Sequence, residues 1–119
     1  MPPIPKMYHN PKCSKSRATL QLLKERKQEI KIIEYLQEPP TAEELDRILR
    51  QLDKKPIEII REKEDRFSEL GLSLNDNRSR EEWIQIMIDN PTLMERPIVV
   101  NNDKAILGRP PENLSLIHI

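Results

Sequence analysis

Apolar and polar positions follow two different periods along the first third of the chain. Over residues 14–27, leucines recur among Lys, Gln and Glu, and this composition and spacing predict a helix. Over residues 30–36, apolar side chains are interleaved with charged ones, which predicts a strand. The short segment 6–9 is expected to be extended and to lead into a turn.

The middle of the chain carries the signals of several helices. Thr41 and Glu44 form a capping-box pattern ahead of Leu and Ile residues at helical spacing. Ser79 and Glu82 repeat that pattern ahead of a helix that stops at residues 90–91. Pro56 can open a short helix in the charged segment between them.

The last third changes character. Residues 97–100 and 104–107 are apolar runs that flank an Asn-Asn-Asp turn, so they predict a β-hairpin, and residues 112–116 are expected to form a terminal helical turn. The order strand, helix, strand, helical block, two strands indicates an α/β layer architecture with a helical insertion. The length predicts one domain over residues 1–119, with a flexible start at 1–5.

Composition narrows the classes of function. Twenty Lys and Arg residues cancel twenty Asp and Glu residues, which argues against a nucleic-acid partner. No apolar stretch reaches membrane-spanning length, and the proline-rich start lacks the apolar core of a signal peptide, so neither a membrane partner nor secretion is expected. A single cysteine cannot form an internal disulfide, which points to the reducing cytoplasm.

That single cysteine, Cys13, has the most informative surroundings in the chain. It lies where the predicted first helix begins, with His9 four residues before it and cations at Lys12, Lys15 and Arg17. Helix-terminal N–H groups and nearby cations lower a thiol pKa and can also hold an oxyanion. The pattern therefore favours a reactive thiolate, with Cys13 as a small buried hydrophobe as the alternative.

Motifs spread over nearly the whole chain resemble those of the glutaredoxin-dependent arsenate reductase family. In chain order they are His9-Asn10-Pro11-x-Cys13, Ser16-Arg17, Arg61, Glu95-Arg96-Pro97 and Gly108-Arg109-Pro110-Pro111-Glu112. The resemblance implies a thioredoxin-like (glutaredoxin-like) mixed sheet with a helical insertion between the second and third strands. It also implies attack of Cys13 on arsenate, with the thiol–arsenate adduct resolved to arsenite by glutathione and glutaredoxin.

The resemblance further implies roles for individual residues. Arg61, Arg96 and Arg109 match the three arginines that hold the oxyanion, while Asn10 and Arg17 belong to the same substrate-binding motifs. His9 and Ser16 match residues that lower the thiol pKa, and Pro97 matches a cis proline beside the active cysteine. Neither a metal nor a bound cofactor is expected, because glutathione would serve as the reductant.

One departure leaves other functions open. Common family members have Gly-Thr after the cysteine, whereas this chain has Ser14-Lys15, which indicates a divergent branch. The first alternative is a regulatory, protein-binding module of the same fold, such as those that bind RNA polymerase. The second is a thiol oxidoreductase for another substrate, such as a glutathione mixed disulfide.

Overall fold

The computed structural model of the chain describes residues 4–117. The chain divides into two compact units: the first comes from its two ends, up to residue 38 and from residue 96, and the second from residues 39–95. The second unit therefore interrupts the sequence of the first, where the helical insertion was predicted. That the two units act as one domain stays a prediction.

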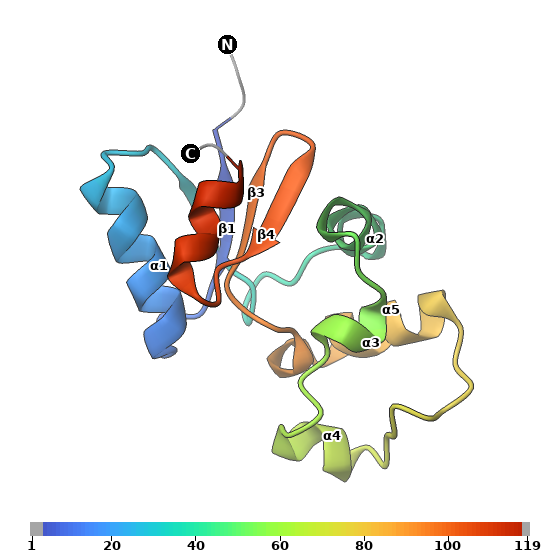
Figure 1. The fold of residues 1–119 in the computed structure, drawn as a ribbon. Helices are drawn as coiled ribbons and strands as arrows, with labels where there is room; N and C mark the ends of the chain where they lie inside the picture. Colours follow the sequence, from blue (N-terminus) through green and yellow to red (C-terminus); the bar gives the residue numbers. More distant parts are fainter. Residues whose placement is uncertain (1–3, 118–119) are drawn as a thin grey trace. The chain divides into compact units, whose positions relative to one another are not determined.

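The first unit is built on a four-stranded mixed sheet. Its strands are β1 (Lys6–His9), β2 (Lys31–Glu34), β3 (Ile98–Asn101) and β4 (Lys104–Leu107), in the spatial order β2-β1-β3-β4. β1 pairs in parallel with β2, whereas the β1–β3 and β3–β4 pairs are antiparallel (Figure 1). The sheet is therefore mixed, as predicted, and the end of β1 delivers the chain to the cysteine segment.

Two helical elements cover one face of this sheet. They are α1 (Ser14–Glu25) and the 3₁₀ helix η2 (Pro111–Ile117), which lie side by side in Figure 1. Met7, Val99 and Ile106 are in register across three strands and pack in one cluster with Leu23 of α1 and Leu114 of η2. Four of these five side chains are fully buried, so this apolar cluster fixes the position of α1 on the sheet.

The second unit is helical. Its elements are α2 (Ala42–Leu52), α3 (Pro56–Ile59), α4 (Asp65–Glu69), α5 (Arg80–Asp89) and the 3₁₀ helix η1 (Pro91–Leu93). Both predicted capping boxes form: Thr41 Oγ1 accepts from the Glu44 N–H at 3.2 Å, and Ser79 Oγ accepts from the Glu82 N–H at 3.1 Å. The buried faces of α2 and α5 pack against each other in the core of this unit.

Some boundaries differ from the sequence prediction. β2 ends at Glu34 because its carbonyl oxygen accepts from the N–H groups of Gln37 (3.0 Å) and Glu38 (2.9 Å), which turns the chain away. α1 ends near Lys27, which adopts a left-handed φ of 55°. The helix α4 was not predicted; its single buried side chain is Phe67.

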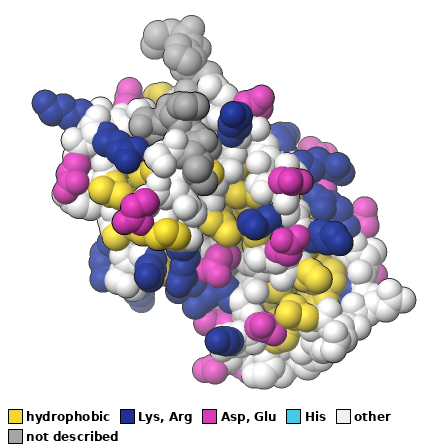
Figure 2. Space-filling view, viewed as in Figure 1, with side chains coloured by type: hydrophobic (Ala, Val, Ile, Leu, Met, Phe, Trp, Pro, Cys, Tyr) yellow, Lys and Arg dark blue, Asp and Glu magenta, His cyan; other side chains and the backbone are white. Residues whose placement is uncertain are grey.

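The expected flexible start falls largely outside the described residues. Of residues 1–5, only Ile4 and Pro5 are described, and Pro5 is buried with its carbonyl oxygen accepting from Lys31 N–H at 2.8 Å. Acidic and basic side chains are interspersed over the face seen in Figure 2, in keeping with the balanced charge. No helix within residues 4–117 is long and apolar enough to cross a bilayer.

Candidate active site

Cys13 occupies the N-cap of α1, at the end of a loop fixed by its own hydrogen bonds. Its backbone is extended (φ −97°, ψ 123°), and its N–H donates to Asn10 O at 3.0 Å. The side chain of Asn10 accepts from the Lys12 N–H at 3.0 Å, so one asparagine supports both residues. Cys13 is buried, with 8% of its surface exposed, at the start of a helix of 12 residues.

The surroundings of the sulfur favour the thiolate. Burial, the largest single influence, raises the pKa of Cys13, but hydrogen bonding from the Ser16 N–H and the charge of Arg96 oppose it. With the added contributions of the Lys15 N–H and the Arg96 side chain, the pKa of Cys13 falls below its ordinary value. First-turn N–H groups and a guanidinium are the groups that stabilise a thiolate at a helix start.

His9 and Ser16 form a buried pair behind the loop. His9 Nδ1 and Ser16 Oγ lie 2.7 Å apart, and Ser16 Oγ also accepts from the Asn10 N–H at 3.1 Å. The family resemblance implies that Ser16 lowers the thiol pKa. In the structure its hydroxyl bonds His9 and Asn10, and its main-chain N–H interacts with the sulfur. The side chain of Ser16 thus joins the end of β1 to the first turn of α1.

Burial also sets the charge of the histidine. It lowers the pKa of His9, as do the charges of Lys24 and Arg17, while Glu34 at the end of β2 opposes them. The imidazole is therefore neutral near pH 7, since the pKa falls from an ordinary value of about 6.5. A neutral ring serves the buried pair as a hydrogen-bonding group and adds no charge to the site.

Arg17 supports the loop. Its guanidinium Nη1 donates to the carbonyl oxygen of Pro11 at 3.0 Å while the side chain remains exposed. This contact ties the second turn of the helix back to the residues before Cys13. Arg17 thus has a structural contact in addition to the substrate-binding role expected from its motif.

The segments of Arg96 and Arg109 meet at a close backbone approach. The Gly108 N–H donates to Pro97 O at 2.8 Å, and the Gly108 carbonyl oxygen accepts from Thr19 Oγ1 at 2.9 Å. A Cβ on Gly108 would lie 2.8 Å from Thr19 Oγ1 and 2.9 Å from Pro97 Cγ, so only glycine fits there. The Arg96–Pro97 peptide bond is cis, the geometry expected from the sequence.

The contacts of Thr19 and Glu34 at this site were not predicted from the sequence. Thr19 is fully buried and links α1 to the Gly108 turn, yet a threonine in a helix gives no signal of this contact. Glu34 affects His9 through the parallel register that pairs the two residues across β1 and β2. The sequence signal available for the turn at Gly108 was the glycine itself, because the chain contains only two glycines, Gly71 and Gly108.

Arg61, the third predicted arginine, belongs to the second unit. Its guanidinium pairs with Glu64 (Nη2 to Oε2, 3.2 Å) and donates to Thr92 O at 3.1 Å. Its backbone N–H donates to Leu93 O at 2.8 Å beside an isolated bridge between Ile60 and Met94. Arg61 is therefore held within its own unit by main-chain and side-chain contacts.

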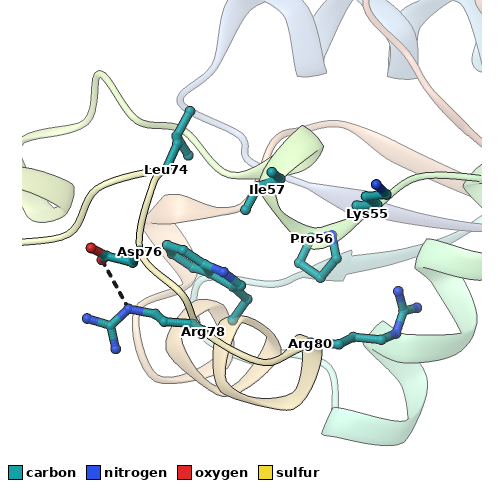
Figure 3. A pocket seen from close by; sticks show the side chains of 8 residues that line it. Lys55, Pro56, Ile57, Leu74, Asp76, Arg78 and Arg80 are labelled. Atoms are coloured by element: carbon teal, nitrogen blue, oxygen red, sulfur yellow. Dashed lines mark hydrogen bonds and ion pairs between the residues drawn. The ribbon is translucent and has the colours of Figure 1, made fainter.

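Two cavities differ in their relation to these residues. One of about 120 Å³ lies in the first unit and is lined in part by His9, Asn10 and Glu34. Another of about 280 Å³ lies in the second unit, where the Asp76–Arg78 ion pair (3.1 Å) borders Trp83 (Figure 3). The larger cavity contains none of the predicted site residues. Within residues 4–117, no group of three or more His, Cys, Asp and Glu side chains could hold a metal ion.

Known proteins share both the sequence and the fold. The profile of the ArsC family matches residues 8–117. The uncharacterized protein YfgD of Escherichia coli (strain K12) is 51% identical over 92% of each chain, and an arsenate reductase of Neisseria meningitidis serogroup B is 43% identical over 98% of this chain and 99% of its own. The solved structure of an arsenate reductase from Vibrio cholerae superposes with a TM-score of 0.88 at 43% identity, covering 95% of this chain and 96% of that one. The predicted thioredoxin-like fold is thereby confirmed.

Proposed function

The chain belongs to the ArsC family, and we propose on this premise that it reduces arsenate to arsenite through Cys13. The carrying observation is the Cys13 sulfur at the start of α1, where Arg96 and two main-chain N–H groups lower its pKa. Arsenate is itself an anion near neutral pH, so a thiolate can approach it only where positive charge offsets the repulsion. Arg96 and the N–H groups at the start of α1 can therefore stabilise the thiolate and also attract the arsenate anion.

The proposed reaction begins with a displacement at arsenic. The Cys13 thiolate attacks the As(V) atom, an S–As bond forms, and one arsenate oxygen leaves as water after protonation. The thiol of glutathione then replaces a second oxygen, again with loss of water. Arsenic remains As(V) through both substitutions, because only ligands have been exchanged.

Reduction follows in the next step. A glutaredoxin thiolate attacks the sulfur of the arsenic-bound glutathione, which gives a mixed disulfide and leaves two electrons on arsenic. Hydrolysis of the remaining S–As(III) bond releases arsenite and restores the Cys13 thiol. The chain holds one cysteine, which stays bound to arsenic in this step, so both sulfurs of the disulfide must come from outside. No bound cofactor is required, and the reducing cytoplasm supplies both thiols.

Arginines are assigned to hold the oxyanion. Arg96 acts at the sulfur, and Arg109 directly follows the Gly108 turn that is bonded to Pro97. Arg61 is proposed as the third by its place in the family motif. We expect Ala at any of the three to reduce arsenate turnover far more than stability, because a charge-assisted anion contact contributes about 1.5–3 kcal/mol.

The deciding experiment is an NADPH-coupled assay of the full chain with arsenate, glutathione, glutaredoxin and glutathione reductase. Wild-type protein should consume NADPH in an arsenate-dependent manner, and Cys13→Ser should abolish that consumption. Reduction of a glutathione mixed disulfide without any reduction of arsenate would contradict the proposal and favour the general thiol oxidoreductase. Inactivity toward both substrates would instead favour the regulatory, protein-binding module.

A further inference from the structure

The smaller cavity lies beside the cysteine loop and carries side chains of both charge signs. Its volume is about 120 Å³, and its walls come from the end of β1 with the loop after it and from the end of β2 with the turn after it: His9, Asn10, Pro11, Lys12, Glu34, Leu36 and Gln37. Sites for whole drug-sized ligands typically measure about 300–1,000 Å³. This cavity can therefore receive only the end of a ligand.

Lys12 and Glu34 supply the two charges. Both residues are exposed, and neither takes part in an ion pair with any other residue in the range 4–117. An ammonium on one wall attracts a carboxylate, and a carboxylate on the other attracts an ammonium. A free α-amino-acid group carries both partners at neutral pH.

The walls of the cavity are fixed by main-chain contacts. On one side, Asn10 accepts from the N–H groups of Lys12 and Cys13, both at 3.0 Å. On the other side, the Gln37 N–H donates to Glu34 O at 3.0 Å and closes the turn after β2. A preformed cavity lowers the entropy cost of binding, so two exposed charges can contribute measurable affinity.

We propose that this cavity binds the α-amino-acid end of the γ-glutamyl group of glutathione. The ligand carboxylate lies at Lys12, its ammonium at Glu34, and its methylene groups contact Leu36 and Pro11. This assignment rests on the proposed function, which makes glutathione the reductant. Lys12 directly precedes Cys13, and adjacent Cα atoms are about 3.8 Å apart. The glutathione sulfur is thereby kept near the sulfur that carries arsenic.

Binding can be measured without the reaction. S-methylglutathione cannot reduce arsenic, so its dissociation constant for the full chain reports the cavity alone, and amide NMR shifts locate the contact. We expect Glu34→Gln and Lys12→Gln each to weaken binding about five- to tenfold. The controls Glu38→Gln and Lys31→Gln remove exposed charges outside the cavity and should stay within about twofold of wild type.

A modified ligand tests the orientation. N-acetyl-S-methylglutathione lacks the ammonium, so wild-type protein should bind it about five- to tenfold more weakly than S-methylglutathione. Glu34→Gln should bind both ligands equally, because the variant has already lost the group that the ammonium contacts. The assignment would be overturned if Glu34→Gln also bound the acetylated ligand about five- to tenfold more weakly than S-methylglutathione. It would likewise be overturned if wild-type protein did not bind S-methylglutathione.

The kinetic readout separates the two proposals. If S-methylglutathione binds as expected but arsenate is not reduced, the proposed function fails and the cavity assignment stands. If arsenate is reduced while both charge variants keep the wild-type KM for glutathione, the cavity assignment fails and the proposed function stands. The expected result is a raised KM for glutathione in Lys12→Gln and Glu34→Gln, and a wild-type KM for glutathione in the controls Lys31→Gln and Glu38→Gln.

Discussion

Ser16 Oγ lies 2.7 Å from His9 Nδ1, and both side chains are buried. This contact links the last residue of β1 to the first turn of α1 and thereby holds the loop that ends in Cys13. Replacing Ser16 by Ala would leave a buried imidazole nitrogen and the Asn10 N–H without this partner. We expect Ser16→Ala to lower the free energy of unfolding by about 1–3 kcal/mol.

The same variant distinguishes the hydroxyl of Ser16 from its main-chain N–H. Because the N–H interacts with the sulfur and survives the substitution, the pKa of Cys13 should change little in Ser16→Ala. Denaturant unfolding gives the stability, and the pH dependence of alkylation by iodoacetamide gives the thiol pKa. Ser14→Ala, at an exposed position of the same helix turn, is the control. A large rise in the thiol pKa would assign the effect to the hydroxyl.

Arg96→Gln should raise the pKa of Cys13. The guanidinium lowers that pKa through its charge and a side-chain hydrogen bond, and glutamine keeps a donor without the charge. Thiol alkylation at pH 7 should therefore slow, since less of the sulfur is ionised. Arg47→Gln, at an exposed position of α2, should leave the alkylation rate unchanged. Equal alkylation rates in Arg96→Gln and wild type would show that Arg96 does not stabilise the thiolate of Cys13.

Because the pKa of His9 is lowered in the folded protein, we expect the free energy of unfolding to depend on pH. Burial lowers the pKa of His9 in the folded state, so below its unfolded value of about 6.5 the unfolded chain binds more protons at this group. Its contribution to stability is therefore present above that value and is lost as the pH falls toward the folded pKa. Unfolding free energies at pH 7.5 and 5.5 should differ less in His9→Gln than in wild type. An identical difference in the two proteins would contradict this effect.

Gly108→Ala tests the close approach between the two arginine segments. The new Cβ would lie 2.8 Å from Thr19 Oγ1 and 2.9 Å from Pro97 Cγ, closer than packed atoms normally come. We expect a loss of about 1–3 kcal/mol in unfolding free energy, because overpacking forces neighbours to move. The arsenate KM should also rise, since Arg109 follows Gly108 directly. Calorimetry and the coupled assay measure the two effects, and unchanged values in both would show that the turn yields freely.

Much of this architecture could be predicted from local sequence. The apolar patterns predicted β2, β3, β4 and the longer helices, residues 6–9 were expected only to be extended, and the capping boxes at Thr41 and Ser79 placed two helix starts correctly. Such signals are local because side-chain spacing and N-cap hydrogen bonds involve residues only a few positions apart. The short helix α4 was missed since one buried phenylalanine makes no periodic pattern.

By itself, the sequence determined most of the elements and placed the one thiol at a helix start, because both are local features. Only the tertiary structure decided which groups surround that thiol. The sheet order places β3 beside β1, and this brings Arg96 to the sulfur across more than eighty positions of the sequence. Likewise, the parallel register of β1 and β2 gives His9 its neighbour Glu34. Such contacts depend on which strands pair and in which register, and the spacing of residues along the sequence does not directly predict the pairing of distant segments.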